Sequence, residues 1–152
     1  MDEWELSERP LTLLMRQDLN TVPPDMPLVM VFTRFLSAGC EDLVVIDAEG
    51  RFLGVITALD LIATVGPTAG VRSRRRGTCI ECLVQQGKIT ARDVMGRHHI
   101  TISAEGTVGE AIRLMERNRY GDLFILDDDG RVTGRISACD IIGHFCRGCD
   151  LV

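Results

Sequence analysis

Residues 54–60 read GVITALD, and residues 134–140 read GRISACD. In both stretches a glycine is followed two positions later by an isoleucine, then by a residue with a hydroxyl group. An aspartate stands three positions after that hydroxyl. This spacing of hydroxyl and acid is typical of a helix N-terminus. Each stretch therefore predicts a strand that runs directly into a capped helix.

The similarity extends well beyond these seven residues. When the sequence is shifted by 80 positions, residues 41–62 align with residues 121–142 without a gap, and ten of the 22 pairs are identical. The same shift pairs Met15 with Met95. An internal repeat of this kind indicates two copies of one structural unit.

The expected elements follow the same order in both copies. A short extended start at Thr21–Val22 or Thr101–Ile102 precedes an amphipathic helix with apolar residues at helical spacing. Two apolar strands come next, joined by the turns Asp-Ala-Glu-Gly and Asp-Asp-Asp-Gly, in which the glycine supplies a positive φ. The capped helix closes each copy. The sequence thus predicts β-α-β-β-α twice, a mixed fold of the α/β (α+β) class.

The predicted organisation of the chain follows the two copies. We expect an N-terminal helical segment at residues 1–18, a first unit at 19–66, a linker at 67–90, a second unit at 91–145 and a C-terminal tail at 146–152.

Composition restricts the class of protein further. No apolar run approaches the ~20 residues of a membrane helix, and the acidic N-terminus lacks the features of a signal peptide. The net charge of −5 argues against general binding to nucleic acid. No nucleophile–base pair or phosphate-cradling glycine loop is evident, so we expect no catalytic residues. A cytoplasmic protein that is not an enzyme and has no membrane contact is the expectation.

These motifs resemble the cystathionine-β-synthase (CBS) domain. Residues 54–60 and 134–140 match its closing signature, G-x-[IV]-[ST]-x-x-D, and residues 91–95 (ARDVM) resemble the segment that commonly opens such a domain. The resemblance covers residues 12–145 and implies two units packed about a pseudo-twofold axis. It also implies that clefts between the units bind adenosine ligands such as AMP, ADP, ATP or S-adenosylmethionine. The expected function is therefore a stand-alone regulatory module for a partner protein that the sequence does not identify.

The signature supplies the candidate nucleotide-binding residues. Asp60 and Asp140, one turn into a helix, can accept hydrogen bonds from a ribose cis-diol. Thr57 and Ser137 lie at the helix N-terminus, where the hydroxyl, the backbone N–H groups and the helix dipole favour a phosphate. The alternative is that all four residues only cap helices. From the resemblance, further candidates are Thr21, Val22, Asp42, Leu43, Thr101, Ile102, Asp122 and Leu123.

The two copies are not identical in charge. Arg135 lies within the second signature where the first has Val55, so the electrostatics of the two sites are expected to differ. Asp42 and Asp122 stand where the family usually has a small or neutral residue, and they either accept a hydrogen bond from adenine or repel a triphosphate. Further candidates for phosphate contacts are His98, His99 and Arg119.

Four cysteines lie outside the repeated core. Cys79 with Cys82 and Cys146 with Cys149 form two C-x-x-C pairs, which fit the ligand count of a Cys₄ zinc site. A redox dithiol, a disulfide between the pairs and four unrelated thiols are the alternatives. An alternative function follows, in which zinc stabilises a nucleic-acid or transcription-associated adaptor. Its contact surface would be the arginine run at residues 72–76 together with a cysteine knuckle.

A homodimer is also expected, because the family commonly assembles two pairs through the helices of each unit. The apolar helix residues that we expect to be available for this contact are Phe32, Phe35, Ile112 and Met115.

Overall fold

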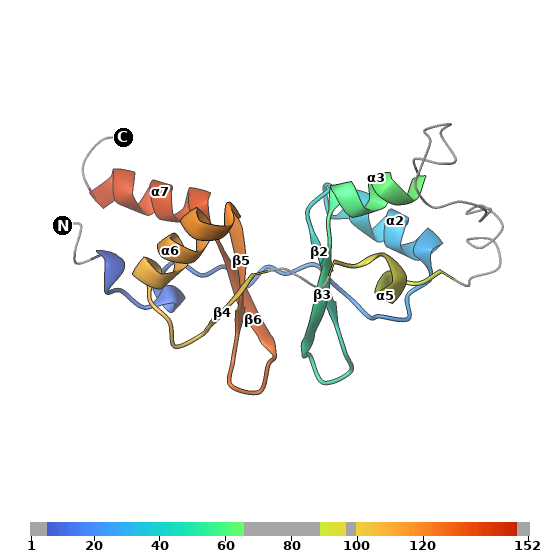
Figure 1. Cartoon of the computed structure of the whole chain (residues 1–152), viewed down its shortest axis with the longest axis horizontal. Coiled ribbons are helices and arrows are strands. Elements are labelled where there is room, and N and C mark those ends of the chain that lie inside the picture. Colours follow the sequence, from blue (N-terminus) through green and yellow to red (C-terminus); the bar gives the residue numbers. More distant parts are fainter. Residues whose placement is uncertain (1–5, 66–88, 97–99, 149–152) are drawn as a thin grey trace. The chain divides into compact units, whose positions relative to one another are not determined.

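The computed structural model describes residues 6–65, 89–96 and 100–148 of the chain (Figure 1). The chain divides into two compact units. One consists of residues 20–98 and is called the Asp60 unit. The other joins residues 1–19 to residues 99–152 and is called the Asp140 unit.

The Asp60 unit is a three-stranded sheet with helices on one face (Figure 1). Its elements are β1 (Thr21–Val22), α2 (Leu28–Ser37), β2 (Leu43–Ile46), β3 (Phe52–Ile56), α3 (Ala58–Val65) and α5 (Ala91–Val94). Strand β2 is central, parallel to β1 and antiparallel to β3. The core forms where Val31 and Phe35 of α2 and Leu61 of α3 meet Leu43 and Ile56 of the sheet.

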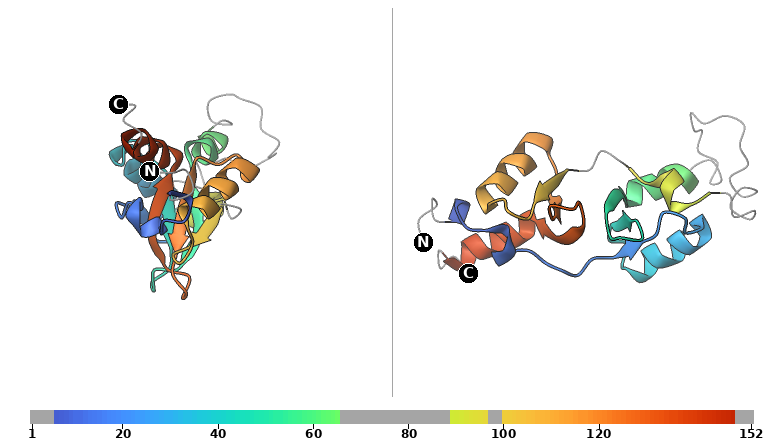
Figure 2. Two further views of the ribbon diagram at one scale, coloured as in Figure 1. Left: turned by 90° about the vertical axis from the view of Figure 1, so that its left-hand side faces the viewer. Right: turned by 90° about the horizontal axis from the view of Figure 1, so that it is seen from below.

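The Asp140 unit repeats this arrangement. Its elements are the 3-10 turn η1 (Leu11–Leu13), β4 (Thr101–Ser103), α6 (Val108–Asn118), β5 (Asp122–Leu126), β6 (Val132–Ser137) and α7 (Ala138–Gly148). Strand β5 is parallel to β4 and antiparallel to β6. The N-terminal segment runs alongside these elements, as Figure 2 shows, and Leu6 and Leu11 belong to their hydrophobic core.

The predicted order β-α-β-β-α is therefore confirmed in both copies. The hairpin turns also form as expected, with positive φ at Gly50 (84°) and Gly130 (81°). In the first turn, Asp47 Oδ1 accepts hydrogen bonds from the backbone N–H groups of Glu49 and Arg51, each at 2.9 Å. In the described part of the N-terminal segment, helical structure is limited to residues 6–7 and η1.

The signature glycines allow a second chain segment to lie against each sheet. A Cβ at Gly54 would lie 2.7 Å from the carbonyl oxygen of Gly96, and a Cβ at Gly134 would lie 2.8 Å from that of Arg16. Residues 91–96, which resemble the opening segment of a CBS domain, thus pack within the Asp60 unit, and residues 15–16 pack within the Asp140 unit. Any larger residue at these two glycines would displace the segment.

The apolar side chains on the helix surfaces differ from those expected. Phe35 and Met115 are buried, and Phe32 and Ile112 pack partly against the cores. The expectation was wrong for Phe35 and Met115, because they lie on the helix faces that cover the sheets. Phe32 and Ile112 keep part of their surface exposed, so for them it stays a prediction. The exposed apolar side chains include Leu36, Leu59, Ile62 and Ile142. None of the described helices is long and apolar enough to cross a membrane.

Candidate functional site

The first signature forms a reciprocal cap at the start of α3. Asp60 Oδ2 accepts hydrogen bonds from the backbone N–H of Thr57 at 2.8 Å and from the Thr57 hydroxyl at 2.9 Å. The backbone N–H of Asp60 donates in return to Thr57 Oγ1 at 3.3 Å. Both side chains are half-buried at this point. The cap therefore holds the Asp60 carboxylate in one orientation.

The second signature repeats this geometry at the start of α7. Asp140 Oδ2 accepts from the Ser137 backbone N–H at 2.9 Å and from the Ser137 hydroxyl at 2.7 Å, while the Asp140 N–H donates to Ser137 Oγ at 3.1 Å. The predicted helix cap is thus formed in both copies, and each cap has the same hydrogen bonds. Each cap uses only Oδ2, and no described residue donates to Oδ1 of either aspartate. Within the part of the chain that the structure describes, Oδ1 therefore remains as a fixed acceptor at each cap.

Arg16 makes the Asp140 cap different from the Asp60 cap. Arg16 Nε lies 3.3 Å from Asp140 Oδ2, with 42% of the Arg16 side chain and 22% of the Asp140 side chain exposed. Burial raises the pKa of Asp140, but the Ser137 hydrogen bonds and the charges of Arg16 and Arg135 outweigh it. The net result is a pKa below the ordinary value. Asp140 is therefore held as the anion.

Gly96 is the counterpart of Arg16 in the Asp60 unit. The backbones of Gly96 and Val55 exchange two hydrogen bonds of 2.8 and 3.0 Å, and those of Arg16 and Arg135 exchange two of 2.8 Å. A Cβ at Gly96 would lie 4.0 Å from Asp60 Oδ2, so a side chain there would extend beside the carboxylate. Arg16 was not among the site residues predicted from the sequence. The 80-residue shift pairs it with Gly96 directly after the methionine pair, but does not indicate which unit the segment joins.

The remaining candidates lie in the two sheets or directly before their strands. Asp122 lies opposite Ser137 in the β5–β6 ladder, and Thr21 lies opposite Val44 in the β1–β2 ladder. Four of the candidates contribute their side chains to the two hydrophobic cores, so only their backbone groups remain for a ligand. These four are Val22, Leu43, Ile102 and Leu123.

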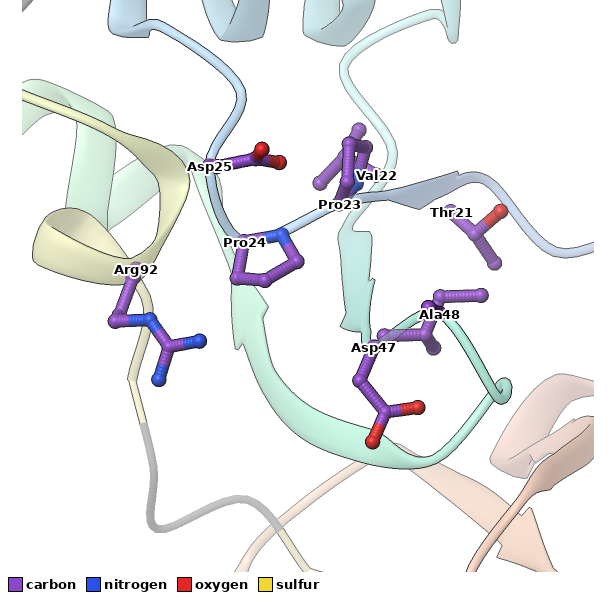
Figure 3. A pocket seen from close by; sticks show the side chains of 9 residues that line it. Thr21, Val22, Pro23, Pro24, Asp25, Asp47, Ala48 and Arg92 are labelled. Atoms are coloured by element: carbon purple, nitrogen blue, oxygen red, sulfur yellow. The ribbon is translucent and has the colours of Figure 1, made fainter.

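A pocket of about 540 Å³ opens at the carboxyl ends of β1 and β2. Arg92 extends toward it from α5, and Asp47 extends from the turn after β2 (Figure 3). Thr21 and Val22 contribute to the wall, but neither Thr57 nor Asp60 does. The pocket lies at the Ile46 end of β2. The other end of β2, Leu43, is paired with Ile56, the residue directly before the Asp60 cap. The pocket and the cap therefore lie at opposite ends of this strand.

Several sequence candidates lie outside the described residues. These are Cys79, Cys82, Cys149, His98, His99 and the arginine run at 72–76. Cys146 is described, as a partly exposed residue of α7. Within the described ranges no group of three His, Cys, Asp or Glu side chains is placed to hold a metal ion. The zinc site therefore stays a prediction.

The comparison with known protein families agrees with this architecture. The model of the CBS domain matches residues 11–66 and again residues 91–146. The chain therefore belongs to the CBS domain family, as a tandem pair.

Known relatives carry this pair in longer chains. An uncharacterized protein of Methanopyrus kandleri is 28% identical over 131 residues, which are 84% of this chain and 58% of the relative. Arabinose 5-phosphate isomerase KdsD of Pseudomonas aeruginosa is 28% identical over 137 residues, 86% of this chain and 37% of the isomerase. The chain thus spans less than two thirds of these curated relatives, one of which is an enzyme.

Solved structures share the fold. CBSX2, solved in complex with AMP, has a TM-score of 0.67 and 18% identity, covering 88% of this chain and 91% of CBSX2. The CBS domain pair of protein MJ0100, solved with 5′-methylthioadenosine and S-adenosyl-L-methionine, has a TM-score of 0.62 and 19% identity, covering 90% and 98%.

Proposed function

We propose that this chain is a regulatory module that binds adenosine-type ligands at the Asp60 cap and at the Asp140 cap. The ligand class comprises AMP, ADP, ATP and S-adenosylmethionine. Binding would change the packing of the module, and an unidentified partner protein would respond to that change. The module is expected to act in the cytoplasm as a homodimer.

The observation that carries this proposal is the reciprocal cap. A carboxylate accepts strong hydrogen bonds from hydroxyl groups such as those of a ribose, and one that is already held in position needs less ordering when the ligand binds. At Asp60 and Asp140 the cap fixes Oδ2 through the preceding Thr57 or Ser137, and Oδ1 receives no bond from the described residues. The adjoining helix N-terminus favours an anionic group. A diol acceptor beside an anion-favouring helix end suits a nucleotide.

The family supports the same ligand class. Two CBS structures with this fold were solved with AMP, and with 5′-methylthioadenosine and S-adenosyl-L-methionine, respectively. The three ligands share an adenosine group and differ in what is attached at the 5′ position. Adenosine recognition at the caps is the simplest account of this shared feature.

Isothermal titration calorimetry on the full chain tests the proposal. AMP, ATP and S-adenosylmethionine should each be titrated, with guanosine monophosphate as a control for the base. We expect at least one adenosine ligand to bind with a dissociation constant below 1 mM, a threshold corresponding to about −4 kcal/mol. If none of the three binds at millimolar concentration, the proposal is wrong.

A further inference from the structure

The pocket of about 540 Å³ in the Asp60 unit opens where strand β1 stops early. In the Asp140 unit, the N–H of Ala104 donates to the carbonyl oxygen of Leu126 at 2.8 Å, and β4 is three residues long. Pro24 is equivalent to Ala104 in the repeat, but a proline has no N–H to donate. Strand β1 is therefore only two residues long, and the chain leaves the sheet beside Ile46, the counterpart of Leu126.

Two prolines and α5 give the pocket firm walls. Pro23 and Pro24 both line it, and the ring of a proline fixes its φ angle. The N–H of Arg92 donates to the carbonyl oxygen of Pro24 at 3.0 Å, and the N–H of Ala91 donates to that of Met26 at 2.9 Å. A preformed pocket with a volume in the range of about 300–1,000 Å³ is typical of a small-molecule site.

A cation and an anion lie close together in one wall. The backbone of Arg92 is bonded to Pro24, the residue directly before Asp25, and the side chains of Arg92 and Asp25 both line the pocket (Figure 3). Asp25 and Arg92, which both lie in the described part of the chain, form no ion pair with each other. A guanidinium group binds a carboxylate through its planar fork, and a carboxylate binds an ammonium group. The two side chains therefore suit a ligand that carries a carboxylate and an ammonium group close together.

Asp47 supplies a second carboxylate to the pocket. Figure 3 shows it beside Ala48, across from Arg92. Its Oδ1 accepts two backbone hydrogen bonds of 2.9 Å within the hairpin turn, which hold the carboxylate in position. Val22, Pro23 and Ala48 give the pocket an apolar lining. A ligand with a second cationic group, joined to the first by a short apolar chain, fits these features.

We propose that this pocket is a second ligand site, which binds an amino acid with a cationic side chain, such as lysine. Arg92 binds the α-carboxylate, Asp25 binds the α-ammonium group and Asp47 binds the terminal ammonium group. The apolar lining contacts the methylene chain. Because the pocket and the Asp60 cap lie at opposite ends of β2, this site does not rest on the proposed adenosine-binding function.

L-Lysine and two compounds that each lack one of its charged groups test the site by isothermal titration calorimetry on the full chain. We expect L-lysine to bind with a dissociation constant below about 1 mM. 1,5-Diaminopentane lacks the carboxylate, and 6-aminohexanoate lacks the α-ammonium group. Each should bind at least about tenfold more weakly than L-lysine, because it loses a charge-assisted hydrogen bond. L-Glutamate, whose side chain ends in an anion, should bind more weakly still.

Variants at the two neighbouring charges assign each group of the ligand to its side chain. Arg92→Gln should weaken L-lysine about tenfold but leave 1,5-diaminopentane within about twofold, since that probe has no carboxylate to lose. Asp25→Asn should weaken L-lysine about tenfold but leave 6-aminohexanoate within about twofold, since that probe has no α-ammonium group. A general loss of structure would weaken all three probes alike.

The repeat supplies a matched control for Asp47, because this residue also caps its hairpin turn. Asp127 is its equivalent in the Asp140 unit, and its Oδ1 accepts the same two backbone hydrogen bonds of 2.9 Å. Asp47→Asn and Asp127→Asn should therefore change the stability of the chain by similar amounts. Only Asp47→Asn should weaken L-lysine, by about tenfold.

The outcomes separate this site from the adenosine sites. A chain that binds AMP but not L-lysine refutes the amino-acid site alone, and a chain that binds L-lysine but no adenosine ligand refutes the adenosine proposal alone. If L-lysine binds with the same affinity to the unmutated chain and to Arg92→Gln, Asp25→Asn and Asp47→Asn, it binds elsewhere and the assignment to this pocket is wrong.

Discussion

Arg16 Nε lies 3.3 Å from Asp140 Oδ2, although the two residues belong to opposite ends of the chain. The contact exists because residues 15–16 lie against β6, where Gly134 leaves room for them. The N-terminal segment therefore supplies a charge to a signature that lies more than 100 positions later in the sequence. In the Asp60 unit, residues 95–96 occupy the corresponding position but bring no charge.

This ion pair predicts how stability depends on pH. The folded state lowers the pKa of Asp140 below its ordinary value of 3.8. Ionised Asp140 therefore stabilises the fold at neutral pH, and this contribution is lost as the pH falls below about 4, where the unfolded chain takes up a proton first. We expect the free energy of unfolding of the unmutated protein to exceed that of Asp140→Asn by a constant amount from pH 7 to about pH 5. The excess should shrink between about pH 4 and pH 3.

Urea unfolding followed by circular dichroism at each pH measures this difference. The variant Arg16→Gln removes one of the charges that lower the pKa of Asp140, so its stability should fall less steeply in the same acidic range. A difference between the unmutated protein and Asp140→Asn that stays constant down to pH 3 would contradict the prediction.

The repeat explains why so much of the fold could be predicted. Residues 41–62 and 121–142 show the same strand, turn and capped-helix pattern, and each copy supports the interpretation of the other. The signals are local: Gly50 and Gly130 mark the turns, and Thr57 and Ser137 mark the helix starts. Local signals of this kind predict structure reliably, because the helix cap and the turn are formed by neighbouring residues.

The parts that could not be predicted depend on contacts between distant residues. Nothing near Arg16 in the sequence indicates that it meets Asp140, because the pairing depends on which unit the segment joins. The exposed helix faces were also assigned wrongly. Phe35 and Met115 satisfy a helical pattern, but only the folded unit shows that they lie on the face that covers the sheet.

The signature glycines provide a second test. A Cβ at Gly134 would lie 2.5 Å from Met15 Cγ and 2.8 Å from the carbonyl oxygen of Arg16, so the N-terminal segment would have to move. We expect Gly134→Ala to lower the free energy of unfolding by about 1–3 kcal/mol, the usual cost of overpacking. Gly121→Ala is the matched control, because no heavy atom lies within 4 Å of its added Cβ. Equal stability of the two variants in urea titrations would show that the close approach is unimportant.

The predicted homodimer can be tested through the exposed helix faces. Ile62 of α3 and Ile142 of α7 are equivalent in the repeat and are each 60% exposed. These are the side chains that we expect the second copy of the chain to cover. We expect light scattering to give twice the 16.8 kDa mass of one chain. The double variant Ile62→Glu with Ile142→Glu should shift the mass toward a single chain, and Leu13→Glu, at a 50% exposed residue of η1, should not. A single-chain mass for the unmutated protein would refute the dimer.

The central prediction is that Asp60 and Asp140 bind ribose. A hydrogen bond to a charged group contributes about 1.5–3 kcal/mol, so replacing either aspartate with alanine should weaken binding at its own cap about tenfold to a hundredfold. The chain supplies a control for the loss of the helix cap itself. Asp93 accepts from the Thr90 N–H at 2.9 Å and from the Thr90 hydroxyl at 3.2 Å, which is the same cap at the start of α5.

Calorimetry with AMP on Asp60→Ala, Asp140→Ala and Asp93→Ala compares these effects. All three variants lose an acid from a first helical turn, so each should lose at least the ~0.3–1 kcal/mol of stability that such an acid contributes. Only the first two should lose affinity, while Asp93→Ala should stay within about twofold of the unmutated protein. The sugar gives a second control. 2′-Deoxy-AMP should bind the unmutated protein more weakly than AMP does. Replacing Asp60 or Asp140 with alanine should lower the affinity for 2′-deoxy-AMP only slightly further. If Asp93→Ala weakens AMP as much as Asp60→Ala and Asp140→Ala do, the aspartates act through helix stability, and ribose recognition by these carboxylates is wrong.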